Sequence, residues 1–281
     1  MQIITDIKEM QKLAHSWRAQ GKSIGIAPTM GYLHRGHLSL MEAARAENDY
    51  VVASIFVNPT QFGPNEDFER YPRDLPADMA LAESVNVDVL FCPEALAMYK
   101  QGFGTYVESQ DLSKHLCGKS RPGHFRGVCT VVLKLFNIVG PNRAYFGQKD
   151  AQQLIILRRM ADDLNLDIEI KSLPIVREQD GLALSSRNVY LTAEERQQAV
   201  ALSRALNRVR ELFVEGERQA AVLHAAIMDE LSRAPLSRID YAEIVDMENL
   251  LPMALLDKAA LIALAVFFGK TRLIDNVFLE G

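Results

Sequence analysis

Two histidines placed three residues apart are the first candidates for chemistry in this chain of 281 residues. His34 and His37 close the segment Thr29-Met30-Gly31-Tyr32-Leu33-His34-Arg35-Gly36-His37. In a tight turn that enters a helix, residues at this spacing lie on one side, so both rings can face the same phosphate. Each ring can donate an N–H and stabilise the negative charge that grows as an α-phosphate is attacked and pyrophosphate leaves. A neutral imidazole suffices for this role.

The surroundings of the histidine pair predict a nucleotide site. Residues 23–28 form a short apolar run that ends in Pro28, and we expect them to be the first parallel strand, with a helix beginning near Gly36 or His37. In open α/β sheets, ligands bind beyond the carboxyl ends of the strands. Gly31 and Gly36 let the backbone approach a phosphate, and the free N–H groups of a helix start favour an anion. Taken alone, the pair is also compatible with two surface or capping histidines.

A second cluster, Gly147-Gln148-Lys149-Asp150, stands at another expected strand-to-helix junction. Lys149 is a mobile point charge suited to a β- or γ-phosphate, and Asp150 can meet a ribose or a metal-bound water. Gln153 follows one helical turn later and would face the same cleft. The competing interpretation is a capped helix with a solvated lysine.

The third cluster is Ser185-Ser186-Arg187, whose two hydroxyls and guanidinium can bind several phosphate oxygens at once. Leu182 and Leu184 alternate into it, which a plain polar linker would not need. Two weaker signals are the amide groups of residues 58–63 and the cations and aromatic rings of the glycine-rich residues 121–127.

Apolar periodicity predicts the elements that position these clusters. Short buried strands alternate with helices up to about residue 174, which favours a doubly wound parallel, Rossmann-like α/β sheet over residues 1–174. Residues 175–281 are expected to form a smaller α+β domain that carries the Ser-Ser-Arg loop. The further expected strands lie at residues 50–57, 87–92, 144–146, 167–173, 241–245, 261–268 and 273–278, and the clearest helical stripes lie at 128–139, 154–164, 202–213 and 220–231.

Composition excludes several classes of function. The net charge of -5, without clustered lysine and arginine, disfavours a nucleic-acid partner. The longest apolar run, residues 259–269, falls well short of the roughly 20 residues that span a bilayer, so it predicts a buried strand and no membrane association. The opening residues lack a secretory pattern, which predicts a cytoplasmic protein. The three cysteines form no ligand pattern, so we expect reduced thiols and no protein-held metal site.

Taken in order, these motifs resemble the pantothenate synthetase (pantoate–β-alanine ligase) family of the HxGH nucleotidyltransferase superfamily. One HxGH string is common to many nucleotidyltransferases, but the whole set is specific and covers nearly the whole chain. The matching residues are Pro28-Thr29-Met30-Gly31, His34, Gly36-His37, Phe56-Val57-Asn58-Pro59, Gln61-Phe62-Gly63, Phe146-Gly147, Lys149-Asp150, Gln152-Gln153 and Ser185-Ser186-Arg187-Asn188.

The resemblance implies an AMP-forming carbon–nitrogen ligase of pantothenate biosynthesis. Pantoate and ATP would give pantoyl adenylate and pyrophosphate, and β-alanine would then release pantothenate and AMP. ATP is a substrate accompanied by Mg²⁺, no tightly bound cofactor is implied, and the chain is expected to form a homodimer. Pantoate brings its own carboxylate nucleophile, so no Ser/His/Asp triad or reactive cysteine is required.

Residue roles follow from the same resemblance. His37 is implied as the acid, and Gln61 and Gln153 as pantoate ligands, with Gln61 also near β-alanine. The ATP site is implied to comprise Met30, Gly31, Tyr32, Leu33, His34, Arg35, Gly36, His37, Gly147, Gln148, Lys149, Asp150, Val176, Leu184, Ser185, Ser186 and Arg187. The implied catalytic residues are His34, His37, Lys149, Ser185, Ser186 and Arg187. The chain departs from the family at Gln148, where glutamate is frequent, and at Ala151, where an aromatic residue is frequent.

Alternatives remain open from the residues alone. Another HxGH nucleotidyltransferase would activate a phosphate instead of a carboxylate. A nucleotide-binding module without catalysis would need neither Lys149 nor Arg187 at the transferring phosphates. A small aminoacyl-tRNA synthetase is disfavoured because this acidic chain has neither a basic face nor an anticodon-binding extension.

Overall fold

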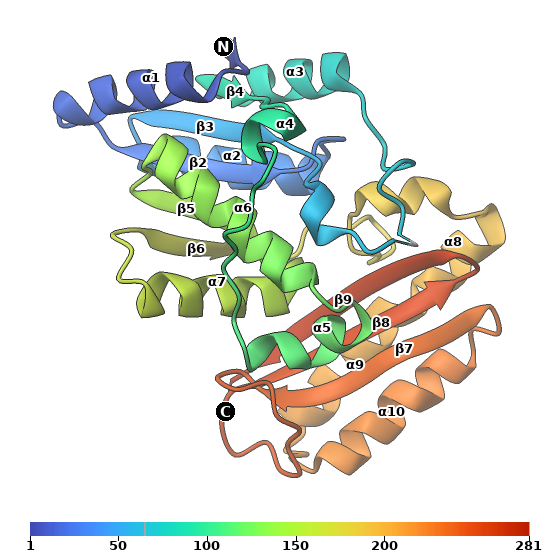
Figure 1. Cartoon of the computed structure of the whole chain (residues 1–281). Helices are drawn as coiled ribbons and strands as arrows, with labels where there is room; N and C mark the ends of the chain where they lie inside the picture. The colour runs from blue at the N-terminus through green and yellow to red at the C-terminus, as the bar shows by residue number, and fades with distance from the viewer. Residues whose placement is uncertain (65, 281) are drawn as a thin grey trace.

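Two sheets, one parallel and one antiparallel, organise the chain (Figure 1). A computed structural model describes residues 1–64 and 66–280. The larger sheet has six parallel strands in the order β1-β4-β3-β2-β5-β6, and the smaller has the antiparallel order β7-β8-β9. The expected fold class is confirmed. The strands are β1 Gln2–Ile4, β2 Ile24–Thr29, β3 Tyr50–Ile55, β4 Val89–Phe91, β5 Arg143–Gly147, β6 Glu169–Leu173, β7 Ser237–Asp246, β8 Ala260–Phe268 and β9 Thr271–Leu279.

Helices cover both faces of the parallel sheet because its strands alternate apolar side chains to either side. In β3, Val52 joins the core formed with α1, α6 and α7, whereas Val51 and Ala53 join the core formed with α2 and α3. The helices are α1 Ile7–Ala19, α2 Arg35–Glu47, α3 Leu75–Ser84, α4 Ala95–Met98, α5 Leu116–Ser120, α6 His124–Val139, α7 Ala151–Asp163, α8 Ala193–Ala199, α9 Ala201–Val214 and α10 Ala220–Ser232, with short 3₁₀ helices η1 Pro59–Gln61, η2 Leu112–Lys114, η3 Gln148–Asp150 and η4 Ser186–Tyr190.

The central strand of the smaller sheet, β8, is buried on both faces, which explains the long apolar run noted in the sequence. In β8, Ile262 and Leu264 belong to the core shared with α9 and α10. Leu261 and Ala263 point to the opposite face and join the core of the parallel sheet. Figure 1 shows this second sheet standing beside the carboxyl ends of the parallel strands. The two parts of the molecule are therefore packed through apolar side chains. The exact division near residue 174 stays a prediction.

The expected order of strands was wrong at the amino end of the chain. The run at residues 23–28 forms β2, not the first strand, because Gln2–Ile4 adds a short strand at the sheet edge beside β4. Three residues are too few to show a period in the sequence. Pro28 lies inside β2 instead of ending it. It is tolerated there because the β2–β5 ladder pairs only Gly25 and Ile26, so no β5 carbonyl faces the missing N–H.

That early divergence of β2 and β5 opens a crevice. Successive strands run from β2 toward β3 on one side and from β5 toward β6 on the other, so the direction of strand order reverses between β2 and β5. Open α/β sheets bind ligands at such a point, beyond the carboxyl ends of the strands. Within residues 1–64 and 66–280, no helix is both long and apolar enough to cross a bilayer.

Candidate active site

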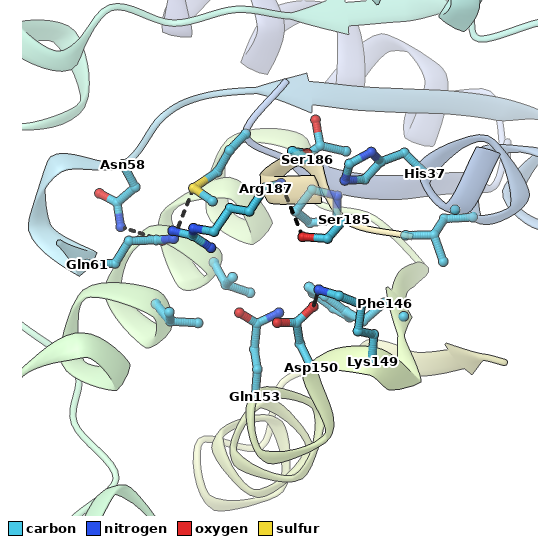
Figure 2. Close-up of a pocket in the computed structure, with 18 of the residues that line it drawn as sticks. His37, Asn58, Gln61, Phe146, Lys149, Asp150, Gln153, Ser185, Ser186 and Arg187 are labelled. Carbon is cyan, nitrogen blue, oxygen red and sulfur yellow. Dashed lines mark hydrogen bonds and ion pairs between the residues drawn. The ribbon is translucent and has the colours of Figure 1, made fainter. Parts of the chain in front are cut away.

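A cavity of about 220 Å³ lies at this switch point between β2 and β5. Three segments far apart in the sequence meet there, namely the loop after β2, the η3 turn after β5 and the loop that enters η4. Figure 2 shows Gln153, Asp150 and Lys149 facing Arg187, Ser185 and His37 across it. The predicted site residues that line this cavity are Met30, His34, Gly36, His37, Gln61, Gly147, Lys149, Asp150, Gln153, Val176, Leu184, Ser185, Ser186 and Arg187.

The two histidines form a reciprocal helix cap. His34 is the N-cap of α2, and its Nδ1 accepts a hydrogen bond from the N–H of Gly36 at 3.2 Å. The N–H of His34 donates to Nδ1 of His37 at 3.3 Å. Since both Nδ1 atoms accept, each neutral ring carries its proton on Nε2. The cap therefore leaves an Nε2–H donor on each of two rings that line the cavity, with ring centroids 4.0 Å apart.

Both rings are neutral at ordinary pH. Burial is the main cause for His34, and the charge of Lys149 adds to it, lowering the pKa to about 4. For His37, burial, the neighbouring His34 and Lys149 hold the pKa well below its usual value. The positive end of the α2 dipole acts in the same direction. The pair thus offers hydrogen-bond donors without an imidazolium charge, which is sufficient for a contact with phosphate.

The helix begins at Arg35, slightly earlier than expected, because an imidazole nitrogen can serve as an N-cap acceptor as an asparagine oxygen does. A Cβ at Gly36 would lie 3.0 Å from the His34 ring, so any larger residue there would push the capping ring aside. His34, and not His37, is thus the residue nearest the helix start. His37 lies inside the first turn, where its ring is fixed by the cap.

A buried carboxylate that no sequence motif indicates holds the preceding turn. Asp78 of α3 accepts from the N–H groups of Tyr32 at 2.9 Å and Leu33 at 2.6 Å. The turn needs this support because Gly31 and Tyr32 both adopt left-handed backbone angles, with φ of 84° and 51°. Asp78 lies 45 and 46 residues away from its partners, so no local pattern could reveal it.

Lys149 and Asp150 bring opposite charges to the η3 side of the cavity. The Lys149 Nζ lies 3.9 Å from Asp150 Oδ2, and the lysine side chain is 21% exposed against 48% for the aspartate. At this distance the pair is loosely held, so both charges can reorient toward a ligand. The η3 turn thus brings one ammonium group and one carboxylate to the same side of the cavity.

Two arginines in the wall are each paired with an acid from the segment between η1 and α3. Arg187 donates to both oxygens of Asp67 at 2.8 and 2.9 Å. Arg121 donates its Nε–H to Glu66 at 2.7 Å. Burial disfavours ionised Asp67, but the hydrogen bonds from Arg187 outweigh it and lower the pKa of that carboxyl. Arg187 is thus present in the cavity wall, though the sequence did not indicate its acidic partner.

Two glutamines stand on opposite walls. The Gln61 Oε1 accepts from Asn58 at 3.1 Å, and its Nε2 approaches the Met30 sulfur at 3.0 Å. The Gln61 backbone carbonyl accepts from His124 Nδ1 at 2.8 Å, which fixes the backbone of η1. Gln153 projects into the cavity from α7, as Figure 2 shows. These amides can both donate to and accept from a polar ligand.

Some predicted ATP-site residues do not line the cavity, which corrects their expected placement. Arg35 is turned to solvent beside Glu42, and Leu33 is buried in the core around α2. A tight turn sends neighbouring side chains in different directions, so only part of the motif can face the ligand. The predicted residues outside the lining are Gly31, Tyr32, Leu33, Arg35 and Gln148. Ala151, one of the departures, is packed in the apolar core.

Other lining residues were missed or only weakly indicated. Tyr71 lies beneath the Arg187 guanidinium, 5.6 Å from it, and had no motif to mark it. Arg121 and His124 belonged to a weak glycine-rich signal. The apolar wall comes from the helical stripe of α6, which periodicity revealed as a core face but not as part of a site. Its cavity-lining members are Val128, Val131, Val132 and Leu135. Among the described residues, no group of three or more His, Cys, Asp and Glu side chains is placed to hold a metal ion.

Comparison with known proteins gives one consistent family. The family model described as pantoate-beta-alanine ligase matches residues 2–278. A pantothenate synthetase of Thermotoga neapolitana is 60% identical over 279 residues, covering 99% of this chain and 100% of the relative. One from Fervidobacterium nodosum is 57% identical over 280 residues, covering all of both chains.

Solved structures agree with the sequence matches. A crystal structure of pantothenate synthetase from Thermus thermophilus has a TM-score of 0.93 and 48% identity, and covers 99% of each chain. A pantoate-beta-alanine ligase from Francisella tularensis, complexed with beta-gamma ATP and beta-alanine, has a TM-score of 0.78 and 37% identity, and covers 99% of this chain and 97% of its own. The similarity therefore extends over nearly the whole chain, both sheets included.

Proposed function

Because this chain belongs to the pantoate–β-alanine ligase family, it is a ligase that joins pantoate to β-alanine, and we propose that the cavity between β2 and β5 carries both steps. In the first step the pantoate carboxylate attacks the α-phosphate of ATP and pyrophosphate leaves. In the second, the β-alanine amine attacks the acyl carbon of pantoyl adenylate and AMP leaves. The enzyme supplies alignment and charge stabilisation in both.

The observation that carries this proposal is the reciprocal cap of the histidine pair, from which the tautomer of both rings follows. Two fixed Nε2–H donors on neutral rings suit an α-phosphate whose negative charge increases in the transition state. Lys149, on the other side of the cavity, would neutralise the departing phosphates. The low pKa leaves His37 in its neutral form, which has no imidazolium proton to give, so we assign it the role of a hydrogen-bond donor to the phosphate oxygens. This role is narrower than the acid that the resemblance implied.

Pantoate suits the part of the cavity that combines amides with an apolar wall. Gln61 and Gln153 can hold its hydroxyls and carboxylate, while Val131 and Leu135 of α6 can pack against its methyl groups. Gln61 would also be within reach of an incoming β-alanine. With pantoate held in this way, its carboxylate would lie between the two glutamines and the histidine pair.

The Ser185-Ser186-Arg187 segment would complete the triphosphate site. Ser185 caps η4 by accepting from the N–H of Arg187 at 3.3 Å, and Ser186 donates to the Tyr32 carbonyl at 3.3 Å. These contacts already tie the segment to the histidine turn. We propose that it covers the bound ATP and keeps water from the adenylate.

Mg²⁺ would arrive with ATP instead of occupying a protein cage. Among the described lining residues, Asp150 is the one carboxylate, and no arginine holds it. Mg²⁺ commonly binds one or two carboxylates together with substrate phosphates. The residues present therefore fit a nucleotide-borne ion. The ion would neutralise phosphate charge, while Lys149 and the histidine donors orient the phosphate group.

We further propose that the chain acts as a homodimer in the cytoplasm. The division into an ATP- and pantoate-binding part, residues 1–174, and a part carrying the Ser-Ser-Arg loop, residues 175–281, belongs to the same proposal. Size-exclusion chromatography with light scattering tests the dimer.

The proposal is tested by product analysis. Incubation with ATP, Mg²⁺, pantoate and β-alanine should yield pantothenate, AMP and pyrophosphate, and pantoate alone should support exchange of labelled pyrophosphate into ATP. Release of ADP, or turnover only with a phosphorylated substrate, would favour another nucleotidyltransferase. Binding of ATP without pantoate-dependent exchange would indicate a non-catalytic nucleotide-binding module.

A further inference from the structure

Two consecutive residues of β9 reach out of the smaller sheet to the loops that form the cavity. Asn276 donates from Nδ2 to the carbonyls of Gln148 at 3.0 Å and Lys149 at 2.8 Å. The residue is only 4% exposed. The amide orientation is fixed because the opposite assignment would point an oxygen at two carbonyls. One buried side chain thus fixes the backbone of the η3 turn from which Lys149 projects.

The adjacent Asp275 holds the other loop. The residue is 2% exposed, and its carboxylate accepts from Arg177 at 2.7 and 2.9 Å. The same guanidinium donates to the Gly181 carbonyl at 3.0 Å. Arg177 pairs across a small hairpin with Ala183. The same hairpin is closed by the N–H of Leu184, which donates to the Val176 carbonyl at 3.0 Å. Asp275 therefore anchors the hairpin that leads directly into Ser185.

The two anchors are themselves joined. The N–H of Asn276 donates to Asp275 Oδ1 at 2.8 Å, so both side chains are set by one short stretch of backbone. That stretch is rigid because β9 is paired along its length with β8. The distance between the Lys149 turn and the Ser185 loop is thereby fixed by a strand that does not itself carry a proposed ligand contact.

We propose that Asp275 and Asn276 form a positioning pair that holds the two phosphate-binding loops at the spacing needed for adenylation. This inference rests on the proposed site and names residues outside it. Asn276 would act through Lys149, and Asp275 through the loop of Ser185 to Arg187. Misplacing a reacting group by about 1 Å can cost on the order of 100-fold in rate. The pair should therefore affect the first step, in which the triphosphate is aligned, more than the second.

The test compares Asn276→Ala with a matched control, Asn48→Ala. Asn48 is also buried and also donates two hydrogen bonds, to the Ala44 carbonyl and the Tyr145 hydroxyl, at the amino end of the parallel sheet. Both variants lose two hydrogen bonds donated by a buried amide, and Asn48→Ala also loses the one that Asn48 accepts from Arg143, so both should unfold at lower urea concentrations. Only Asn276→Ala should slow pyrophosphate exchange at saturating ATP, by about 10- to 100-fold, while attack of β-alanine on preformed pantoyl adenylate changes by less than about threefold.

A double-mutant cycle separates this role from a purely structural one. If Asn276 acts through Lys149, adding Asn276→Ala to Lys149→Ala should slow exchange by less than about threefold further, since interacting residues are not additive. Full additivity, or equal loss in Asn48→Ala, would overturn the positioning role while leaving the proposed function intact. No effect of Lys149→Ala itself would overturn both. Asn276→Ser, which keeps one hydroxyl donor, is judged by the same outcomes if the alanine variant does not fold.

Discussion

Arg187 donates two hydrogen bonds to Asp67, at 2.8 and 2.9 Å, in the wall of the cavity that would receive a triphosphate. The guanidinium is thus positioned by an acid whose negative charge opposes the ligand proposed for the same place. Binding of ATP must either displace Asp67 from Arg187 or place polyphosphate beside a carboxylate. Either event costs free energy of binding, so Asp67 should weaken ATP binding. In the absence of ATP, the same carboxylate fixes the position of Arg187.

The first prediction is that Asp67→Asn binds ATP more tightly, with the Kd lowered about three- to tenfold, the range expected when roughly 1 kcal/mol of like-charge repulsion is removed. Isothermal titration with a non-hydrolysable ATP analogue measures it. Asp111→Asn, which removes an exposed acid paired with Lys114, is the control and should leave Kd unchanged. Weaker ATP binding by Asp67→Asn would show instead that the pair persists in the complex.

The second prediction concerns the histidine donors. His37→Ala should lower turnover by roughly 10²- to 10⁴-fold, the usual range for a positioned donor or oxyanion-type contact. The effect should appear in pyrophosphate exchange, with His224→Ala on the exposed face of α10 as the control. A loss smaller than about threefold would remove His37 from the proposed machinery.

The third prediction separates the two chemical steps. Lys149→Ala should slow formation of the adenylate more than its reaction with β-alanine, because the lysine is proposed to contact phosphates that depart in the first step. Supplying preformed pantoyl adenylate measures the second step alone. Lys114→Ala, an exposed lysine on η2, is the control. Equal slowing of both steps would argue for a general structural role.

The fourth prediction contrasts two neighbouring glutamines. Gln153 lines the cavity, so Gln153→Ala should raise KM for pantoate about 10- to 100-fold, as expected for lost ligand hydrogen bonds. Gln152 is buried and accepts from the N–H of Cys117 while donating to the Leu112 and His115 carbonyls. Gln152→Ala should therefore lower the free energy of unfolding by about 1 to 3 kcal/mol, without a comparable rise in KM.

The reverse pattern, a pantoate effect at Gln152 and none at Gln153, would show that α7 presents a different face to the substrate. Steady-state kinetics and urea unfolding on the same two preparations distinguish the cases.

Local patterns were enough to indicate several residues that line the cavity. His37, Lys149 and Ser185 follow turns at the ends of elements that apolar periodicity reveals, and the position of β2 and β5 in an open sheet brings two of them to one edge. The helical stripe of α6 and the apolar run of β8 were likewise visible, because burial on one or both faces leaves a period in the sequence.

The supporting residues could not be found in the same way. Asp78, Asp67, Asp275 and Asn276 hold the site from other elements, and each is a single polar residue whose partner lies far along the chain. A buried acid is recognisable only when the N–H or guanidinium it accepts from is known. Orientation within a turn was also beyond reach, which is why Arg35 and Leu33 were expected to line the site and do not.

The fifth prediction follows from three partly buried rings that are neutral in the fold. Burial, followed by the charge of Arg121, lowers the pKa of His124 to about 4, and His34 and His37 are lowered from 6.5 as well. The unfolded chain binds these protons first as pH falls. Stability is therefore fully present above pH 6.5 and is lost progressively toward pH 4, by up to about 1.4 kcal/mol per pH unit for each ring.

Replacing one ring should flatten that loss. In urea unfolding at pH 7, 6 and 5, His124→Gln should reduce the fall in unfolding free energy between pH 6 and 5 by about 1 kcal/mol, whatever its stability at pH 7. His15→Gln is the matched control, because His15 is exposed on α1 and its ring is solvated in both states. Acidic groups also titrate in this interval, but they are common to all three proteins and cancel in the comparison. An unchanged slope in His124→Gln would mean that this ring takes up its proton over the same pH range in the folded protein as in the unfolded chain, which the hydrogen bond that His124 Nε2 accepts from Arg121 should prevent.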